Sequence, residues 1–228
     1  GLDRYVADGI LTTGQADFLR RAVRERQNIL IAGATSSGKT TLANALLAEI
    51  AATGDRVLVL EDTIELQCAA RDHVPLRTRA GVVSMTELVR ATMRLRPDRV
   101  IVGEVRGGEA LDLVKVWGTG HPGGIATIHA GSALGALLRL EQLILEVAVN
   151  PPRALIAEAV NVVIHIAGRG RKRRVESVAR VVGFDGVGYR LANALEALET
   201  PSPELTPVLL AADTAAPSPS PDQPGELP

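Results

Sequence analysis

The sequence contains few aromatic residues and a single cysteine. Phe, Trp and Tyr together make up 2% of its 228 residues, so we expect a core of Leu, Val, Ile and Ala. Such a core is typical of buried parallel sheets and their covering helices, and it favours an α/β fold over an all-β sandwich. Because Cys68 stands alone, an intramolecular disulfide and a cysteine-rich zinc site are excluded, which fits a reducing compartment such as the cytoplasm.

Long apolar runs and a strong net charge are also lacking. No stretch approaches the roughly 18 to 20 apolar residues that cross a bilayer, so we expect any membrane association to be peripheral. The formal net charge of −1 gives no global electrostatic reason to expect nucleic-acid binding. The composition, 46% hydrophobic and 22% charged, is typical of a globular domain with a sizeable core.

Strand and helix patterns alternate through the first two thirds of the sequence. We expect helices over 13–26, 39–52, 84–95, 108–117, 132–147 and 152–161, and strands over 28–32, 57–60, 100–102 and 125–129. Ser84 and Glu87 form a capping-box pattern, and Pro97 ends the helix that they begin. The alternation predicts an α/β fold with a mostly parallel sheet flanked by helices.

The pattern changes after residue 161. Short strands over 162–166, 174–183 and 188–191, joined by glycine-rich turns, predict a small antiparallel C-terminal β appendage. From Thr200 onward Pro and Ser recur with few large apolar residues, which predicts a disordered tail.

A phosphate-binding loop lies between the first predicted strand and the helix that follows it. The segment Gly-Ala-Thr-Ser-Ser-Gly-Lys-Thr fits the P-loop pattern, and we expect its backbone N–H groups to surround the phosphates of ATP. Lys39 adds a charge near the β and γ phosphates, the Thr40 hydroxyl is expected on Mg²⁺, and Thr41 on the α-phosphate. The expected nucleotide-binding residues are Gly33, Ala34, Thr35, Ser36, Ser37, Gly38, Lys39, Thr40 and Thr41.

Acidic residues follow two of the predicted strands. Glu104 ends the strand over 100–102, where a carboxylate can orient water for attack on the γ-phosphate. Gly103 precedes it where many ATPases have Asp, so we expect Mg²⁺ to be held by Thr40, the nucleotide and waters, with Glu61 or Asp62 in the outer shell. Taken alone, the acidic pair could equally be a helix cap or a surface turn.

His129 and several basic residues have two interpretations each. His129 follows a strand and could sense the γ-phosphate, or it could be a satisfied buried histidine. Arg94, Arg96 and Arg106 flank the Glu104 strand and could neutralise phosphate charge in the same or a neighbouring subunit, or pair with local acids. The basic run 169–174 could contact nucleic acid, acidic lipid or a protein, but no aromatic residue interrupts it, which favours a solvated hairpin turn.

Four segments in order resemble the traffic ATPases of type II and type IV secretion. They are the phosphate loop, Leu-Glu-Asp-Thr-x-Glu-Leu (60–66), Arg-x-x-Pro-Asp-Arg-Val-Ile-Val-Gly-Glu-Val-Arg-Gly (94–107) and Gly-Gly-Ile-Ala-Thr-Ile-His-Ala (123–130). The stretch over 108–124, which contains Gly-Glu-Ala-Leu-Asp-Leu and Trp-Gly-Thr-Gly-His-Pro-Gly-Gly, resembles the type IV secretion and conjugation branch of that family. The lone cysteine argues against the type II enzymes that carry a four-cysteine zinc insert.

The resemblance implies a RecA-like P-loop NTPase that hydrolyses ATP with Mg²⁺ and assembles into a hexameric ring at the cytoplasmic face of the inner membrane. It would power pilus assembly or substrate transfer, with inner-membrane channel proteins as partners. The catalytic positions that it implies are Glu104, Lys39, Glu61, His129, Arg94 and Arg106. The alternatives are a nucleotide-binding scaffold without turnover, or an ATPase of a related pilus or type II machine.

Two departures from that family affect the loop, and a third affects the domain organisation. Ala34 and Ser36 stand where the family usually has glycines, and small side chains there still let the backbone approach phosphate. The chain begins at Gly1, so we expect the family's N-terminal domain to precede it. The expected regions are therefore a connecting segment and helix over 1–26, the ATPase domain over 27–198 and the tail over 199–228.

Overall fold

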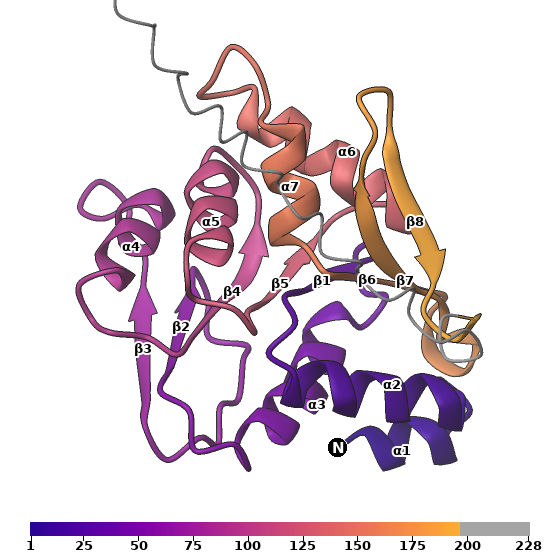
Figure 1. The fold of residues 1–228 in the computed structure, drawn as a ribbon. Coiled ribbons are helices and arrows are strands. Elements are labelled where there is room, and N and C mark those ends of the chain that lie inside the picture. Colours follow the sequence, from indigo (N-terminus) through magenta and orange to yellow (C-terminus); the bar gives the residue numbers. More distant parts are fainter. Residues whose placement is uncertain (197–228) are drawn as a thin grey trace, which may run out of the picture.

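The computed structural model describes residues 1–196, and one sheet runs through this part of the chain (Figure 1). Its strand order is β3-β2-β4-β5-β1-β6-β7-β8. The strands from β3 to β6 are parallel, and β7 and β8 are antiparallel. The strands are β1 (Ile29–Ala32), β2 (Val57–Glu61), β3 (His73–Arg77), β4 (Arg99–Val105), β5 (Ile125–Ile128), β6 (Val162–Ala167), β7 (Arg174–Phe184) and β8 (Tyr189–Asn193).

Helices cover both faces of the sheet. They are α1 (Leu2–Ala7), α2 (Thr13–Arg24), α3 (Lys39–Ile50), α4 (Met85–Thr92), α5 (Glu109–Gly118), α6 (Ala133–Ile144) and α7 (Arg153–Ala159). Helices α1 to α3 lie on one face and α4 to α7 on the other (Figure 1). Successive residues of β1 alternate between them, since Ile31 belongs to the first core and Leu30 to the second. Every residue of β1 is buried, as a central parallel strand requires.

The predicted mostly parallel α/β fold is confirmed, and the strand predicted over 162–166 is present as β6. This strand pairs antiparallel with β7, as predicted, but on its other side it pairs parallel with β1, so it belongs to the main sheet and not to a separate appendage. Its residues Val162 to Ile166 are buried, so it is a central strand. Only β7 and β8 are antiparallel, and they extend the same sheet. Strand β3 was not predicted; it is an edge strand with alternating burial and contains Pro75.

The predicted capping box is present, and the N-terminal helices share the core of the sheet. The Ser84 hydroxyl accepts from the Glu87 backbone, while the Glu87 carboxylate accepts from the Ser84 backbone. Leu2 of α1 and Leu19 of α2 are buried in the same cluster as Ile29 of β1. The expected boundary at residues 26 and 27 stays a prediction, and the expected disordered tail over 199–228 lies outside the described residues.

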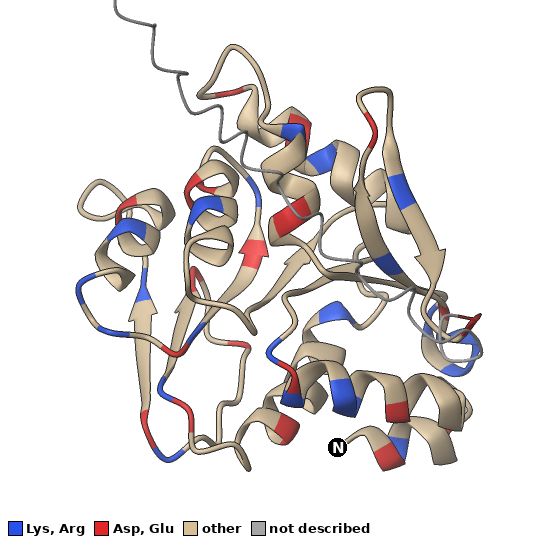
Figure 2. Cartoon of the chain, viewed as in Figure 1, with Lys and Arg blue, Asp and Glu red and all other residues tan. Residues whose placement is uncertain are grey.

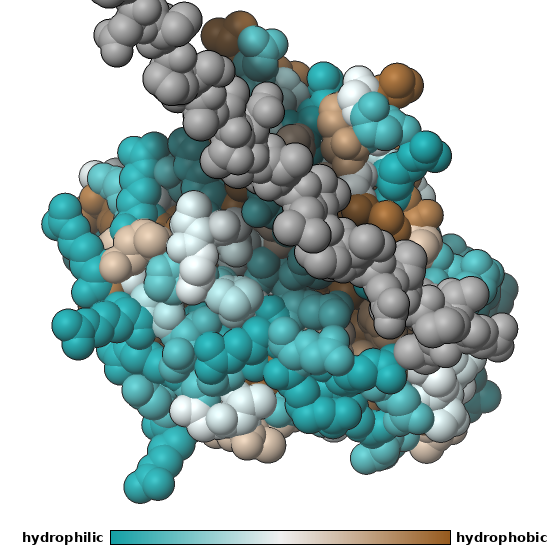
Figure 3. Space-filling model, in the orientation of Figure 1, coloured by the Kyte–Doolittle hydropathy of each residue, from teal (hydrophilic) through white to brown (hydrophobic). Residues whose placement is uncertain are grey.

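The surface seen in Figure 3 is mainly hydrophilic, with hydrophobic side chains at two projecting tips. One tip is the connection between α6 and α7, where Val147 and Val149 are exposed, and the other is the β7–β8 hairpin, where Val187 is exposed. Among residues 1–196, no helix has the length and apolar character needed to span a membrane.

A buried charge network joins the amino-terminal ends of the strands. The Arg99 side chain is 1% exposed and donates to Asp55 Oδ2 at 2.6 Å. It also donates to the carbonyl of Val23 at 2.9 Å and to that of Gly123 at 3.2 Å. The Arg26 guanidinium also pairs with Asp55. The network thus ties α2 to the starts of β2, β4 and β5, on the edge opposite the phosphate loop.

We expect Asp55→Asn to destabilise the fold, because it leaves the buried Arg99 cation without a counter-charge. Removing one partner of a buried pair costs about 3–5 kcal/mol of unfolding free energy. The control is Asp8→Asn, since the Arg4–Asp8 pair is exposed and is worth about 1 kcal/mol or less. Urea unfolding followed by circular dichroism measures both variants, and equal losses would contradict the role given to Asp55.

The Asp55 contribution is expected to depend on pH. Burial opposes ionisation, but hydrogen bonds from Thr53 and Arg99 and the charges of Arg99 and Arg26 hold the pKa of Asp55 below its ordinary value. The stabilisation is therefore complete above the unfolded-state pKa of about 3.9 and is lost as pH falls through the folded-state pKa. Unfolding titrations from neutral pH down to about pH 3 should show the difference between wild type and Asp55→Asn shrinking at the acid end. A constant difference would be the contrary result.

Candidate nucleotide site

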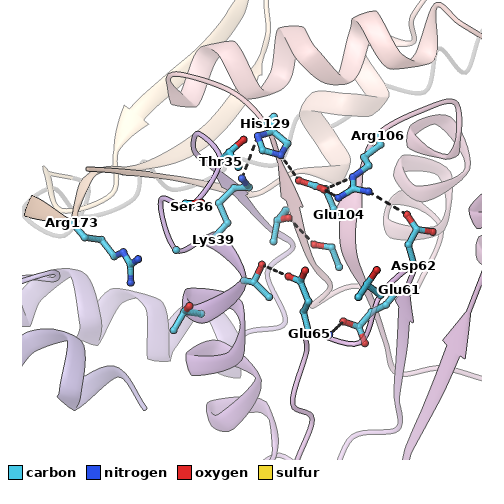
Figure 4. Close-up of a pocket in the computed structure, with 16 residues that line it drawn as sticks. Thr35, Ser36, Lys39, Glu61, Asp62, Glu65, Glu104, Arg106, His129 and Arg173 are labelled. Carbon is cyan, nitrogen blue, oxygen red and sulfur yellow. Dashed lines mark hydrogen bonds and ion pairs between the residues drawn. The ribbon is translucent and has the colours of Figure 1, made fainter. Parts of the chain in front are cut away.

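A cavity of about 470 Å³ opens at the carboxyl ends of β1, β2, β4 and β5 (Figure 4). In a parallel sheet these ends meet at one edge, which is where ligands bind in α/β folds. The cavity is lined by Thr35, Ser36, Gly38, Lys39, Thr40, Thr41, Glu61, Asp62, Thr63, Glu65, Gly103, Glu104, Arg106, Thr127, His129 and Arg173. It therefore contains most of the expected site residues, with Arg94 as the exception among the catalytic ones.

Close packing and local backbone geometry shape the phosphate loop. A Cβ on Gly33 would lie 2.5 Å from the carbonyl oxygen of Ile166 and would overlap the hydroxyl of Ser37, so no side chain fits there. Gly38 has φ +99°, a left-handed conformation that favours glycine, and α3 begins at the next residue. The loop and the helix N-terminus thus present their backbone donors together.

The backbone conformation of Ser36 shows what the replacement of a family glycine costs at this position. Its φ is +63°, in the left-handed region that favours glycine, at a position where the family usually has glycine. A non-glycine residue in this conformation costs roughly 1 kcal/mol of conformational free energy, and the loop keeps the left-handed conformation despite that cost. Ala34 is not among the described residues with positive φ, so its side chain carries no comparable strain.

A line of polar contacts runs from the phosphate loop to Glu104. Lys39 Nζ donates to the carbonyl oxygens of Gly33 at 3.0 Å and Ala34 at 3.2 Å, and it lies 3.4 Å from His129 Nδ1. His129 Nε2 lies 2.7 Å from Glu104 Oε1. An ammonium only donates and a carboxylate only accepts, so a neutral imidazole with its proton on Nε2 satisfies both neighbours.

The environment of Lys39 is built for a counter-anion. Burial lowers the pKa of Lys39 from its ordinary value, and the charge of Arg106 adds to this, while Glu104 and Glu65 oppose it. A phosphate next to the ammonium would favour its charged form, since an opposite charge at close range does so. The site therefore suits an anionic ligand.

A β-bulge directs Glu104 into the cavity. Val102 pairs with Ala126 and Val105 with Ile128, so β4 advances three residues while β5 advances two. The extra residue falls at Gly103 and Glu104, and bulges of this kind re-aim side chains next to active sites. The Gly103 carbonyl accepts from the Thr127 hydroxyl at 2.7 Å, so the bulge leaves no unsatisfied acceptor there.

The arginines predicted around this strand behave differently. Arg106 is 65% exposed, pairs with the Glu104 carboxylate and reaches to 3.7 Å from Asp62 Oδ2. Arg94 lies in the connection between α4 and β4, is exposed and does not line the cavity. Arg96 is also exposed and outside it. A role for Arg94 in a neighbouring subunit stays a prediction.

The acidic box is divided between a structural contact and the cavity. Glu61 is buried, and its Oε1 accepts from the backbone of Glu65 at 2.9 Å and of Leu66 at 2.7 Å, which folds the following loop. A Cβ on Gly103 would lie 3.2 Å from Glu61 Cγ, so this side chain occupies the space that a larger residue at 103 would need. Asp62 accepts from the Thr78 hydroxyl at 2.6 Å.

Two charged residues of the cavity, Glu65 and Arg173, were not predicted as site residues. Glu65 Oε2 accepts from the Thr40 hydroxyl at 3.1 Å, so it meets the residue expected on Mg²⁺. Arg173 belongs to the basic run, and the interpretation of that run as a solvated turn is wrong for this residue, which lines the cavity. A signal for both existed, because Glu65 lies in the quoted acidic box and the basic run follows a strand end.

The cavity offers some, but not all, of the oxygen ligands that a Mg²⁺ ion needs. Hydroxyl and carboxylate oxygens are ligands that Mg²⁺ prefers, and Thr40 and Glu65 bring them together. Within residues 1–196, no group of three or more His, Cys, Asp or Glu side chains could hold a metal ion. A magnesium ion here would need further oxygens from phosphate and water.

Comparison with known proteins places this chain in a family. Residues 4–181 match the model of the "Type II/IV secretion system protein" family. The conjugal transfer protein TrbB of Rhizobium radiobacter is 51% identical over 191 residues, which cover 83% of this chain and 59% of that protein. The type IV secretion system protein PtlH of Bordetella pertussis is 41% identical over 178 residues, covering 71% of this chain and 52% of that protein.

A solved structure agrees with the fold and the sequence. The VirB11 ATPase of the Brucella suis type IV secretion system, in complex with sulphate, has a TM-score of 0.66 and 36% identity, covering 72% of this chain and 51% of that one. The chain thus spans about half to three fifths of the length of the relatives it matches. It belongs to the type II/IV secretion system protein family and is similar within it to the type IV secretion and conjugal transfer ATPases.

Proposed function

We propose that this chain binds ATP with Mg²⁺ and hydrolyses it as the motor subunit of a type IV secretion or conjugal transfer system. The observation that carries the proposal is the line of contacts Lys39–His129–Glu104, which begins on the phosphate loop and ends on a carboxylate in the same cavity. A carboxylate one imidazole away from the phosphate-loop lysine would lie beside the terminal phosphate, where it would orient the attacking water.

Binding rests on the loop and on unsatisfied polar atoms beside it. The backbone donors from Gly33 to Thr41 and the positive end of α3 favour an anion. The Ser37 hydroxyl and the Nε of Arg173 are buried without a hydrogen-bond partner among the described residues, which is uncommon in a folded protein. The sulphate in the related VirB11 structure is consistent with an anion site in this fold.

Hydrolysis would use Glu104 to orient the attacking water. The carboxylate is 16% exposed, so it reaches the cavity while its position is fixed by His129 and Arg106. The His129 imidazole would connect a bound γ-phosphate to the Glu104 carboxylate, because its Nδ1 faces Lys39 and its Nε2 contacts Glu104. The Lys39 ammonium would exchange its hydrogen bonds to the loop carbonyls for hydrogen bonds to the phosphates. Arg106 and Asp62 would set the charge around the carboxylate.

Mg²⁺ would be held by Thr40 and the phosphates, with Glu65 beside Thr40 and with Glu61 and Asp62 further out. When bound, the ion neutralises phosphate charge in the transition state. Glu61 acts mainly through the loop that it folds, because its Oε1 already accepts two backbone hydrogen bonds.

The assembly is part of the proposal and is supported by the similarity to secretion and conjugation proteins. The two relatives described above are a conjugal transfer protein and a type IV secretion protein. A homo-hexameric ring at the cytoplasmic face of the inner membrane, in contact with channel proteins, accords with this. The exposed Arg94 would then face a neighbouring subunit, and residues 27–198 would form the ATPase domain.

We expect Glu104→Gln to lower the rate of ATP hydrolysis while leaving nucleotide affinity unchanged. The amide keeps the shape of the side chain but cannot accept a proton, and losing a general base costs about 10²- to 10⁴-fold in kcat. Phosphate release gives the rate, and calorimetry with Mg–ADP gives the affinity. Both are measured at several protein concentrations, because ring assembly can limit turnover.

The matched control is Glu158→Gln, an exposed glutamate of α7 outside the cavity. It should leave both rate and affinity unchanged. If the parent chain binds nucleotide but never turns it over, the scaffold alternative replaces the motor proposal. If it binds no nucleotide at any concentration, the proposed site itself is wrong.

We expect Glu65→Gln to raise the Mg²⁺ concentration needed for half-maximal hydrolysis. The Glu65 carboxylate lies 3.1 Å from the Thr40 hydroxyl, and loss of an outer-shell carboxylate lowers metal affinity by about 10- to 100-fold. Activity is titrated with Mg²⁺ at saturating ATP, with Glu158→Gln again as control. An unchanged Mg²⁺ dependence would show that Glu65 takes no part in holding the ion.

A further inference from the structure

The turn between β6 and β7 brings a strongly basic segment to the phosphate loop. Residues 168–173 form it, and it includes a 3-10 turn over Gly170–Lys172 (Figure 2). Because β6 lies parallel beside β1, the turn begins at the same edge of the sheet as the phosphate loop. The side chain of Arg169 donates to the carbonyl of Thr35 at 3.4 Å, so the two loops are in contact.

The turn is held in place at both ends. Gly168 has φ +79°, and a Cβ on it would overlap the carbonyl oxygen of Lys172, so only glycine closes the turn this way. At the other end, Val175 N donates to the carbonyl of Ile10 at 2.8 Å, which fixes the start of β7 to the connection between α1 and α2. The side chains that the turn carries are therefore positioned before any ligand binds.

Arg173 differs from its basic neighbours in direction and in surroundings. Arg169, Arg171, Lys172 and Arg174 are exposed, and Arg174 pairs with Glu176. Arg173 is half-buried and lies over Gly38, where a Cβ would be 2.7 Å from its Nε and 2.9 Å from its Cζ. Figure 4 shows it on the side of the phosphate loop away from Glu104 and Arg106.

The Arg173 guanidinium makes no hydrogen bond or ion pair with any side chain of residues 1–196, and its Nε is buried without a partner. The Tyr5 hydroxyl is close enough for the charge of Arg173 to act on it: burial raises the pKa of Tyr5, and the charge of Arg173 partly opposes that rise. Tyr5 is therefore neutral near pH 7 and supplies no counter-charge. A buried donor atom such as this Nε costs free energy when it has no acceptor, and a bound anion would supply one.

We propose that Arg173 binds the phosphates that ATP and ADP share, on the α-phosphate side of the loop. This inference rests on the proposed function, because it takes the cavity to be a nucleotide site. Glu104 and His129 mark the γ-phosphate end, and Lys39 serves the β and γ phosphates. Arg173 lies on the opposite side, beside Gly38 and within the same cavity as Thr41. A planar guanidinium with several donors suits phosphate oxygens at that position.

The location predicts a binding effect and not a rate effect. A contact to phosphates common to substrate and product stabilises ground state and transition state alike, so its loss raises KM without lowering kcat. Loss of an arginine that served the γ-phosphate would instead lower kcat and leave ADP affinity unchanged.

The test compares Arg173→Ala with Arg171→Ala, a control on the same turn that is exposed and outside the cavity. We expect Arg173→Ala to weaken Mg–ADP binding and to raise KM for ATP by the same factor, roughly 10- to 100-fold, as for loss of a charge-assisted hydrogen bond. The value of kcat should stay within about twofold. Arg173→Lys should fall between wild type and Arg173→Ala.

Inorganic pyrophosphate, used as a competitor of ADP, separates a phosphate contact from a contact to the base. Its inhibition constant should rise in Arg173→Ala by a factor similar to that for ADP. Unchanged pyrophosphate inhibition, a loss of kcat with ADP binding kept, or equal effects of the two alanine variants would each overturn the proposal. Equal thermal midpoints for the two variants confirm that the turn still folds.

The outcome is distinguishable from failure of the proposed function. If the wild-type chain binds Mg–ADP but does not hydrolyse ATP, only the motor proposal fails, and the Arg173 comparison is made on ADP and pyrophosphate. If the wild-type chain binds no nucleotide, both proposals are wrong.

Discussion

The absence of a side chain at Gly33 is the constraint on which the arrangement of the site depends. With no Cβ there, the phosphate loop lies directly against the end of β6, at a distance that any other residue would prevent. The close approach has two consequences. It lets the loop turn tightly from β1 into α3, and it brings the segment that follows β6 next to the loop. One small residue therefore connects local loop geometry to the order of strands in the sheet.

The cavity that results has two sides with different chemistry. On one side Glu104, His129 and Arg106 form a continuous set of hydrogen bonds and ion pairs, so their positions are mutually determined. On the other side Arg173 stands without a counter-charge. Lys39 lies between them on the loop. Under the two proposals, the terminal phosphate of a nucleotide would lie on the Glu104 side and its inner phosphates beside Arg173.

Much of this could be predicted from sequence, because the relevant patterns are local. The loop from Gly33 to Thr40 is a continuous segment between a strand and a helix, and Glu104 and His129 each follow an apolar run. Since parallel strands end at one edge, residues at those ends were expected to meet, and they do. The local capping box at Ser84 was recognisable for the same reason.

The parts that were missed depend on contacts between distant residues. The direction of β6 is set by its pairing with β1, and Asn28 N donates to Asn161 Oδ1 across 133 residues of sequence. Without that pairing the basic run could be taken for a solvated hairpin. Glu65 was missed because the loop after β2 has no periodic pattern, and its course is fixed by the buried Glu61 carboxylate.

Gly103 and Glu61 show how the site supplies an acid that the sequence lacks at its usual place. Where many ATPases have Asp, this chain has Gly103, whose missing side chain leaves room for Glu61. Glu61 in turn accepts hydrogen bonds from the backbone of Glu65 and Leu66, and this places the Glu65 carboxylate beside the Thr40 hydroxyl. The carboxylate therefore comes from a loop that β2 organises and not from β4. Arg106 pairs with Glu104 and lies 3.7 Å from Asp62, so the loop after β2 also reaches the Glu104 carboxylate through an exposed arginine.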